Sequence, residues 1–191
     1  MSYLVIEENT PAAIALLPLR KSEFKTWEGS APARLQRWAK ASGFEARPGQ
    51  CLALPDEEGN ISGYLFGMQE EGWLFQLAAV WRELPAGQYA LSCDWTREQV
   101  CQASLGWGLA AYRFDRYRKN GQPVRTLQLP ADVAAWVQPL CAAQCLVRDL
   151  VNTPTEHMGP AELSDAALAE SDCFGARLRV ITGEELLSEN F

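Results

Sequence analysis

Residues 148–160 read RDLVNTPTEHMGP, and the organisation of the chain is easiest to follow from this segment. It ends a long apolar pattern of helical spacing that covers residues 131–151. A second helix is expected directly after it, with Gly159 as N-cap, Pro160 as first residue and Glu162 in the first turn. The segment also holds His157, the only histidine of the chain. Helix-ending and helix-starting chemistry on either side of a short loop indicates a junction between two parts.

The composition is that of a globular protein. The chain has 191 residues, of which 48% are hydrophobic and 21% charged, so it can form one sizeable core, or one domain and the start of another. It carries 17 basic and 24 acidic residues, and the formal charge of −7 argues against nucleic acid or an anionic membrane as the main partner. Residues 101–150 are more basic than the acidic stretches on both sides, which places a compositional boundary near residue 150.

The sequence predicts a cytoplasmic protein. Residues 1–9 lack the basic start of a signal peptide, and no apolar run reaches the ~18 residues that a membrane span needs. Most of the six cysteines, at positions 51, 93, 101, 141, 145 and 173, lie within apolar patterns. We therefore expect reduced, buried thiols rather than disulfides.

Strand and helix patterns alternate along most of the chain. Strands are expected at residues 12–19, 50–55, 61–68, 88–93, 124–129 and 177–181, with a loop containing Trp27 and Gly29 after the first. Helices are expected from a Ser30 cap to Gly43, over 73–84, 96–112 and 131–151, and from 160 onward. This alternation predicts an α/β fold, a mixed β-sheet flanked by helices.

Two of the expected helices contain residues that helices disfavour. Gly106 and Gly108 lie inside the helix that a Thr96–Gln99 capping box opens. Each glycine costs ~1 kcal/mol relative to alanine, so we expect a close packing contact to compensate. Pro139 should kink or split the helix over 131–151. The inner stripe of that helix is expected to contain Val133, Val137, Leu140, Val147 and Val151.

A search for catalytic motifs gives two candidate sites with opposing interpretations. The chain has no Gly-rich phosphate loop, paired-histidine zinc helix, CxxC pair or Gly-x-Ser-x-Gly elbow. His157 is either a base or metal ligand, or a loop histidine at a helix end, and the second is favoured because no partner cluster surrounds it. Cys141 and Cys145, one helical turn apart, are either half of a metal site or, as we favour, small buried side chains.

Three charged segments have structural interpretations as well. Residues 112–119 mix basic and aromatic side chains, which fits either nucleic-acid binding or, as the acidic total favours, a basic helix end with inward aromatics. Asp56–Glu58 is typical of a solvated turn. Glu184 and Glu185 are expected at a helix start, where Thr182 and Glu185 form a second capping box.

Three segments resemble the M17 leucyl aminopeptidase family. Residues 105–117 are similar to a family helix that ends in a Tyr-x-Phe-x-x-Tyr pattern. Residues 148–154, followed by Pro160 and Leu163, match the junction between the two halves of that family. Residues 182–186 and the final Asn190-Phe191 resemble the start of its catalytic half.

The resemblance implies a macro-domain-like N-terminal domain at residues 1–130, a linker helix and junction at 131–159, and a truncated start of the peptidase domain at 160–191. It implies a cytoplasmic hexamer that removes N-terminal residues from peptides with two divalent ions, zinc or manganese. The family's metal ligands, catalytic arginine and Asn-Thr-Asp-Ala-Glu-Gly-Arg motif all follow the junction. No catalytic, cofactor-binding or metal residue is therefore assigned in this chain.

The expected function is that of a non-catalytic N-terminal portion, inactive alone, whose partner is its own peptidase domain and whose role is assembly and access to the active site. Arg148 and Asp149 are expected to tie the long helix to that domain. The alternative is a standalone macro-like module that binds a nucleotide or ADP-ribose through amides at a helix N-terminus.

Overall fold

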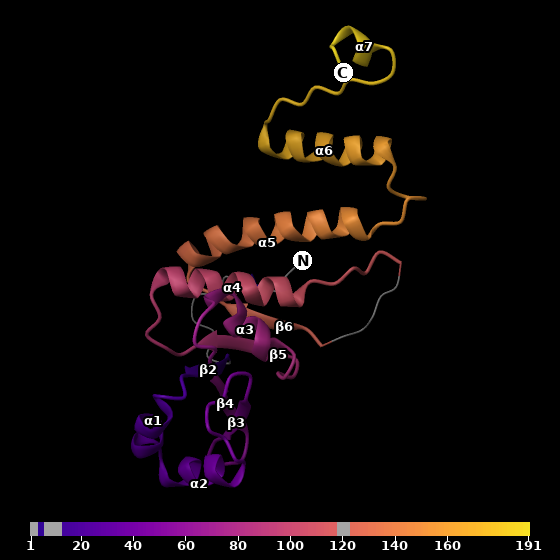
Figure 1. The fold of residues 1–191 in the computed structure, drawn as a ribbon. Coiled ribbons are helices and arrows are strands. Elements are labelled where there is room, and N and C mark those ends of the chain that lie inside the picture. Colours follow the sequence, from indigo (N-terminus) through magenta and orange to yellow (C-terminus); the bar gives the residue numbers. More distant parts are fainter. Residues whose placement is uncertain (1–3, 6–12, 118–122) are drawn as a thin grey trace. The chain divides into compact units, whose positions relative to one another are not determined.

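A six-stranded sheet organises the first part of the chain (Figure 1). The computed structural model describes residues 4–5, 13–117 and 123–191, so Ala12 and residues 118–119 lie outside the described part. The sheet order is β1-β6-β5-β2-β4-β3, and only the β3–β4 pair is antiparallel. The prediction of a mixed sheet flanked by helices is confirmed. The strands are β1 (Leu4–Val5), β2 (Ile14–Leu19), β3 (Cys51–Pro55), β4 (Ile61–Gly67), β5 (Gly87–Leu91) and β6 (Arg125–Gln128).

After β2, the chain first forms strands on one side of β2 in the sheet, and later forms strands on the other side of β2. Helices α1 (Phe24–Ser30) and α2 (Ala33–Ala41) and strand β3 lead from β2 to β4. Helix α3 (Trp73–Trp81) leads back to β5, and α4 (Arg97–Ala111) continues to β6. Parallel neighbours require such crossovers. The reversal makes the carboxyl ends of β2 and β5 a topological switch point, where open α/β sheets bind ligands.

The sheet carries a hydrophobic core on each face. Leu16, Tyr89 and Leu127 pack with α3, α4 and the first half of α5 (Ala131–Asn152) on one face. Leu19, Leu52 and Leu65 pack with α1 and α2 on the other. Trp107 of α4 is fully buried and its ring centroid lies 5.8 Å from that of Tyr89.

Helix α4 begins and packs as the sequence predicted. The Thr96 backbone N–H donates to Gln99 Oε1 at 2.9 Å, and the Gln99 N–H donates to Thr96 Oγ1 at 3.4 Å. A Cβ added at Gly106 would lie 1.7 Å from the carbonyl oxygen of Leu74 in α3. The close contact expected at this glycine is therefore real, and it is a backbone-to-backbone approach of two helices.

The segment after β2 was predicted wrongly. Trp27 and Gly29 belong to α1 and not to a loop. Ser30 does not cap the following helix, because its hydroxyl donates to the Trp27 carbonyl at 3.1 Å and so helps to end α1. Pro32 occupies the N-cap position of α2. Packing of Phe24 and Trp27 against the core, with Phe24 edge-on to Phe44, favours the helix over the loop that local composition indicated.

Helix α5 is one continuous helix, so Pro139 does not split it. Proline has no N–H, so the carbonyl of Ala135 receives no helical hydrogen bond from Pro139. Both residues are exposed, so water can bind that carbonyl instead. The predicted inner stripe is correct for Val133 and Val137, which are buried, and wrong beyond them. Leu140, Val147 and Val151 are exposed.

The chain divides into two compact units, residues 1–145 and 146–191, and the boundary falls within α5. The boundaries predicted at residues 130 and 160 stay predictions. In the second unit, α6 (Pro160–Phe174) starts as expected, with Gly159 as N-cap and its N–H donating to Glu162 Oε2 at 2.9 Å. Hydrogen bonds from the backbone of Glu162 itself and next from Gly159 lower the pKa of the Glu162 carboxyl, and burial opposes them.

Two expectations for the end of the chain are wrong. Residues 177–181 form no strand, since no described strand lies beside them to provide a hydrogen-bonded partner. The last helix, α7 (Glu185–Ser188), has Glu184 at its N-cap position and no side-chain cap, so Thr182 forms no capping box. Across the described residues, no helix is both long enough and apolar enough to cross a bilayer.

The turn between β3 and β4 depends on one carboxylate, which gives a testable pH dependence. Burial alone would raise the pKa of Asp56, but hydrogen bonds from Asn60, Glu58 and Gly59 outweigh it and lower the pKa below its ordinary value. A carboxyl whose pKa is lowered on folding stabilises the fold above its unfolded pKa and loses that contribution as the pH falls through the folded value. We expect Asp56→Ala to lower the Tm near neutral pH, and the difference from wild type to shrink below the ordinary aspartate pKa of ~3.9. Thermal unfolding at a series of pH values measures this, with the exposed Glu57→Ala as control; a difference independent of pH would contradict it.

Candidate functional site

The residues that the sequence singled out do not meet in one site. His157 is exposed in the turn between α5 and α6, where its backbone N–H donates to the Pro154 carbonyl at 2.9 Å. Cys145 is buried in α5, and half-buried Cys141 points its Sγ at the Leu105 carbonyl, 4.0 Å away. In the described part of the chain, no three His, Cys, Asp or Glu side chains are grouped so that they could hold a metal ion. The absence of a catalytic or metal role for these residues stays a prediction.

The basic and aromatic segment is not a helix end. Helix α4 stops at Ala111, and the described residues from Tyr112 to Tyr117 follow it as irregular chain. Phe114 and Tyr117 make an edge contact with centroids 5.7 Å apart, and the Arg116 guanidinium lies 5.8 Å from the Tyr117 ring. Tyr117 is exposed, so the prediction that the aromatics pack inward fails there. Phe114 and Arg116 therefore both contact Tyr117 within this segment.

The junction segment ends α5 through its backbone. The Thr153 hydroxyl and N–H both donate to the Asp149 carbonyl, at 2.7 and 3.0 Å, and Thr153 is buried. These bonds close the last turn of α5, and the helix ends there because Pro154 has no N–H to donate and disfavours helical backbone at Thr153. The expected tie from Arg148 and Asp149 to another domain stays a prediction.

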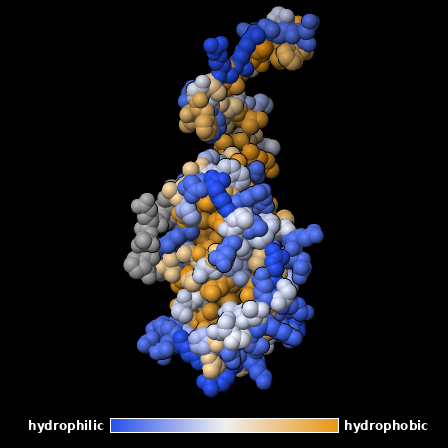
Figure 2. Space-filling model, turned by 90° about the vertical axis from the view of Figure 1, so that its left-hand side faces the viewer, coloured by the Kyte–Doolittle hydropathy of each residue, from blue (hydrophilic) through white to orange (hydrophobic). Residues whose placement is uncertain are grey.

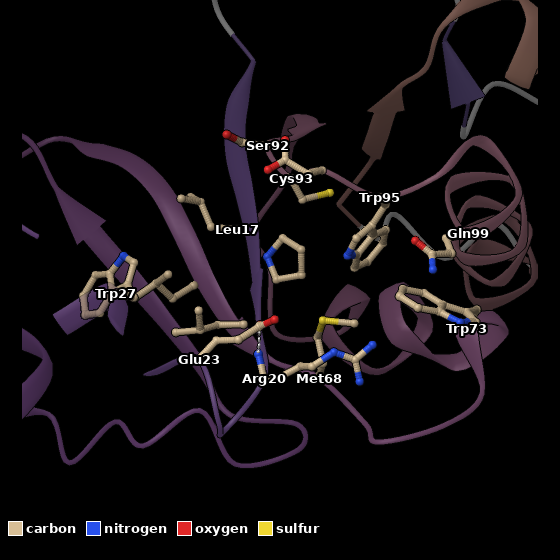
Figure 3. A pocket seen from close by; sticks show the side chains of 14 residues that line it. Leu17, Arg20, Glu23, Trp27, Met68, Trp73, Ser92, Cys93, Trp95 and Gln99 are labelled. Carbon is tan, nitrogen blue, oxygen red and sulfur yellow. Dashed lines mark hydrogen bonds between the residues drawn. The ribbon is translucent and has the colours of Figure 1, made fainter. Parts of the chain in front are cut away.

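The feature that the sequence did not single out is a cavity of about 400 Å³ at the switch point (Figure 3). Its walls come from the carboxyl ends of three parallel strands: Arg20 directly follows β2, Met68 follows β4, and Cys93 lies two residues beyond β5. The starts of α1, α3 and α4 complete it. The position was predictable, because carboxyl ends of parallel strands share one edge of the sheet.

Three tryptophans are among the residues that line the cavity. Trp73 and Trp95 lie together on one side of the cavity and Trp27 lies on the other (Figure 3). The first two rings meet edge to face with centroids 5.1 Å apart. The loop before Trp73 is held by buried Gln76, which accepts from the Gln69 N–H at 2.9 Å and donates to the Gln69 carbonyl at 3.2 Å.

Three charged residues are among those that line the cavity. The Arg20 guanidinium lies 5.5 Å from the Trp73 ring centroid and donates to the Glu70 carbonyl at 3.5 Å. Glu23 accepts from the Arg20 backbone N–H at 2.9 Å through one carboxylate oxygen. Asp94 is the third. The formal charge of the lining is therefore −1, from one guanidinium and two carboxylates.

Cys93 does not make this cavity a nucleophilic centre. Burial raises the pKa of its thiol; a hydrogen bond from the Trp95 backbone opposes this, and the charge of Asp94 adds to it. A raised pKa leaves the sulfur as unreactive thiol near neutral pH. The arrangement is suited to holding a molecule rather than to attacking one.

The reactivity of two other thiols, those of Cys51 and Cys173, gives a test of how burial changes cysteine pKa values in this structure. Burial, and next the charge of Glu83, raise the pKa of Cys51 to about 11, whereas Cys173 is exposed. At a pH near 8, on the order of 0.1% of Cys51 would be thiolate. We expect iodoacetamide to modify Cys173 well before Cys51, with mass spectrometry of peptides as the readout. Unfolding in urea should remove the difference, and equal rates in the folded protein would contradict the expectation.

The alternative of a nucleotide-binding module finds no support at the cavity. Glu23 and Asp94 would repel phosphate groups. At the start of α4 beside it, the capping box already uses the backbone N–H groups of Thr96 and Gln99.

Comparisons with known proteins give a consistent picture. Residues 14–130 match the family model of the M17 aminopeptidase N-terminal domain. A probable cytosol aminopeptidase of Neisseria meningitidis is 33% identical over 96 residues, which are 46% of this chain and 20% of that protein. Peptidase B of Yersinia pestis is 31% identical over 101 residues, 49% of this chain and 23% of that protein. The matched part thus spans about a fifth of these relatives.

Two solved structures extend the likeness over nearly the whole chain. The cytosol aminopeptidase of Coxiella burnetii has a TM-score of 0.90 at 30% identity, over 97% of this chain and 41% of that one. The bottromycin maturation enzyme BotP, solved in complex with Mn, has a TM-score of 0.72 at 24% identity, over 93% of this chain and 40% of that one. At 24% identity, the likeness to BotP shows a shared fold and nothing more.

Proposed function

Because this chain belongs to the M17 aminopeptidase family, whose N-terminal domain it contains, we propose that it is the non-catalytic N-terminal portion of a metal-dependent aminopeptidase. In this proposal the complete enzyme hydrolyses N-terminal residues from peptides in the cytoplasm, as a hexamer. The present chain contributes assembly and shapes access to the active site. The names of the relatives, which are cytosol aminopeptidases and peptidase B, support the substrate class and the compartment.

The observation that carries the proposal is the surface of the unit at residues 146–191. None of its large apolar side chains is buried in the described structure. Three of them, Val151, Phe174 and Phe191, are 78, 79 and 80% exposed. Apolar side chains of α6 and the tail reach the surface in the same way (orange in Figure 2). Exposed apolar side chains in this number are typical of a surface that a partner covers. The proposed cover is the peptidase domain that continues the chain.

The residues present do not fit the pair of divalent ions that the family implies. Cys141 and Cys145 are packed in α5, His157 stands in a turn, and the described residues contain no group of three suitable donors. We therefore assign the ions, zinc or manganese, to the peptidase half of the proposed enzyme. No catalytic step is derived from this chain.

The test is an activity comparison. The 191-residue chain alone should release no product from an amino-acyl amide with zinc or manganese present. The same chain continued by its peptidase half should be active and should sediment as a larger assembly. Metal-dependent turnover by the chain alone would overturn the assignment of a non-catalytic role.

A further inference from the structure

We propose that the switch-point cavity binds a small primary amine, a molecule with one ammonium group on an apolar body. The proposal concerns residues 17–99 alone. It does not depend on the role proposed for the chain in a larger enzyme.

The size and the lining of the cavity favour a small organic molecule. A volume of about 400 Å³ falls in the usual range of ligand pockets, and the lining combines polar with apolar surface. Met68 and the three indoles supply the apolar surface, and the charged groups are confined to three side chains. Figure 3 shows Glu23 and Met68 between Trp27 on one side and the pair of Trp73 and Trp95 on the other.

The balance of charge selects a cation over an anion. The one cationic side chain in the lining, Arg20, is already placed against the Trp73 ring and the Glu70 carbonyl. Glu23 has one oxygen bound to the Arg20 N–H, and the described structure gives no hydrogen bond to its other oxygen. Asp94 is the second acidic residue of the lining. An ammonium group donates three hydrogen bonds and accepts none, which matches free carboxylate oxygens.

The indoles favour a cation for a separate reason. The face of a tryptophan ring attracts cations within about 6 Å of its centroid. The chain already uses this attraction, since the Arg20 guanidinium lies 5.5 Å from the centroid of Trp73. Trp27 and Trp95 present further indoles to the same space. A bare ammonium ion would leave this apolar surface uncovered, so the ligand needs an apolar body as well.

The experiment is calorimetric titration of the 191-residue chain with three matched probes near pH 7. 3-Methylbutylamine has both features, methylamine has the charge without the body, and 4-methylpentanoate has a similar body with the opposite charge. We expect saturable binding of 3-methylbutylamine with a Kd on the order of 1–10 mM, which suits a ligand of this size. Methylamine and 4-methylpentanoate should bind at least about tenfold more weakly.

Four variants locate the binding. Glu23→Gln and Asp94→Asn should each weaken binding of 3-methylbutylamine by roughly two- to fivefold, as expected for partly solvated ion pairs. Glu28→Gln and Glu98→Gln, which remove acids of α1 and α4 that do not line the cavity, should leave it unchanged. Circular dichroism and the Tm of each variant establish that it is folded. These four side chains are not in the core, so folding should be preserved.

Three results would overturn the proposal. One is the absence of saturable heat with 3-methylbutylamine up to about 50 mM. Another is binding of 4-methylpentanoate at equal strength, which would indicate a site selective for the apolar body alone. The third is binding that both lining-carboxylate variants leave unchanged, which would place the amine elsewhere on the acidic surface. Each result concerns binding only and leaves the proposed role in an aminopeptidase as it stands.

Discussion

Gly106→Ala is expected to lower the free energy of unfolding by about 2–4 kcal/mol, although alanine is the better helix former by ~1 kcal/mol. The new Cβ would lie 1.7 Å from the backbone oxygen of Leu74, so α3 and α4 would have to move apart. Backbone cannot rotate away as a flexible side chain can. The separation would disturb the core around Trp107, which lies next in sequence and is fully buried. Urea unfolding followed by circular dichroism measures the change.

The matched control is Gly29→Ala. Gly29 also lies inside a helix, α1, but it is exposed and a Cβ there would meet nothing within 4 Å. The same substitution should stabilise the protein by about 0.5–1 kcal/mol, because alanine removes the entropic cost of glycine without a contact to disturb. If Gly106→Ala changed stability no more than Gly29→Ala, the close approach of the two helices would be wrong.

Gly106 and Gly29 also show how much of the fold could be predicted from the sequence. A glycine inside a strong helical pattern is unfavourable, so a close contact could be expected at Gly106 without knowing its partner. Helix α1 could not be foreseen, because Gly29 and Ser30 indicate a loop locally and only the packing of Phe24 and Trp27 on the sheet favours a helix. The segment 177–181 failed in the opposite way: its strand pattern finds no described strand to pair with.

The candidate site, too, could be predicted from the sequence only in part. Arg20 follows a predicted strand, and Met68 and Cys93 are the last residues of two others, so their place at one edge of a parallel sheet could have been inferred. Which three strands are neighbours could not, because the order β5-β2-β4 differs from the order along the chain. The family was easier to identify than the site. The resemblance rested on three segments, in the α4 region, at the junction and over residues 182–191, and the match of residues 14–130 to the family model confirms the family.

Replacing Val151 and Phe174 by serine together should have little effect on the 191-residue chain and a large effect on the same chain continued by its proposed peptidase half. Both side chains are almost fully exposed in the 191-residue chain, where surface substitutions change stability by about 0.5 kcal/mol or less. If the peptidase half covers this surface, each apolar side chain contributes about 1.5–3 kcal/mol on burial. The double variant of the chain continued by its peptidase half should then lose roughly 3–6 kcal/mol from the docking of the two halves.

Limited proteolysis and sedimentation of the longer protein measure that loss, as cleavage near the junction and as breakdown of the assembly. The control is Glu170→Ser on the exposed surface of α6, which removes no apolar surface and should affect neither form. The contrast is decisive because the substitutions are identical in both forms and only the partner differs. A double variant that is as resistant to protease and as fully assembled as wild type would mean that the peptidase half leaves this surface uncovered. The exposure of Val151 and Phe174 would then require another explanation.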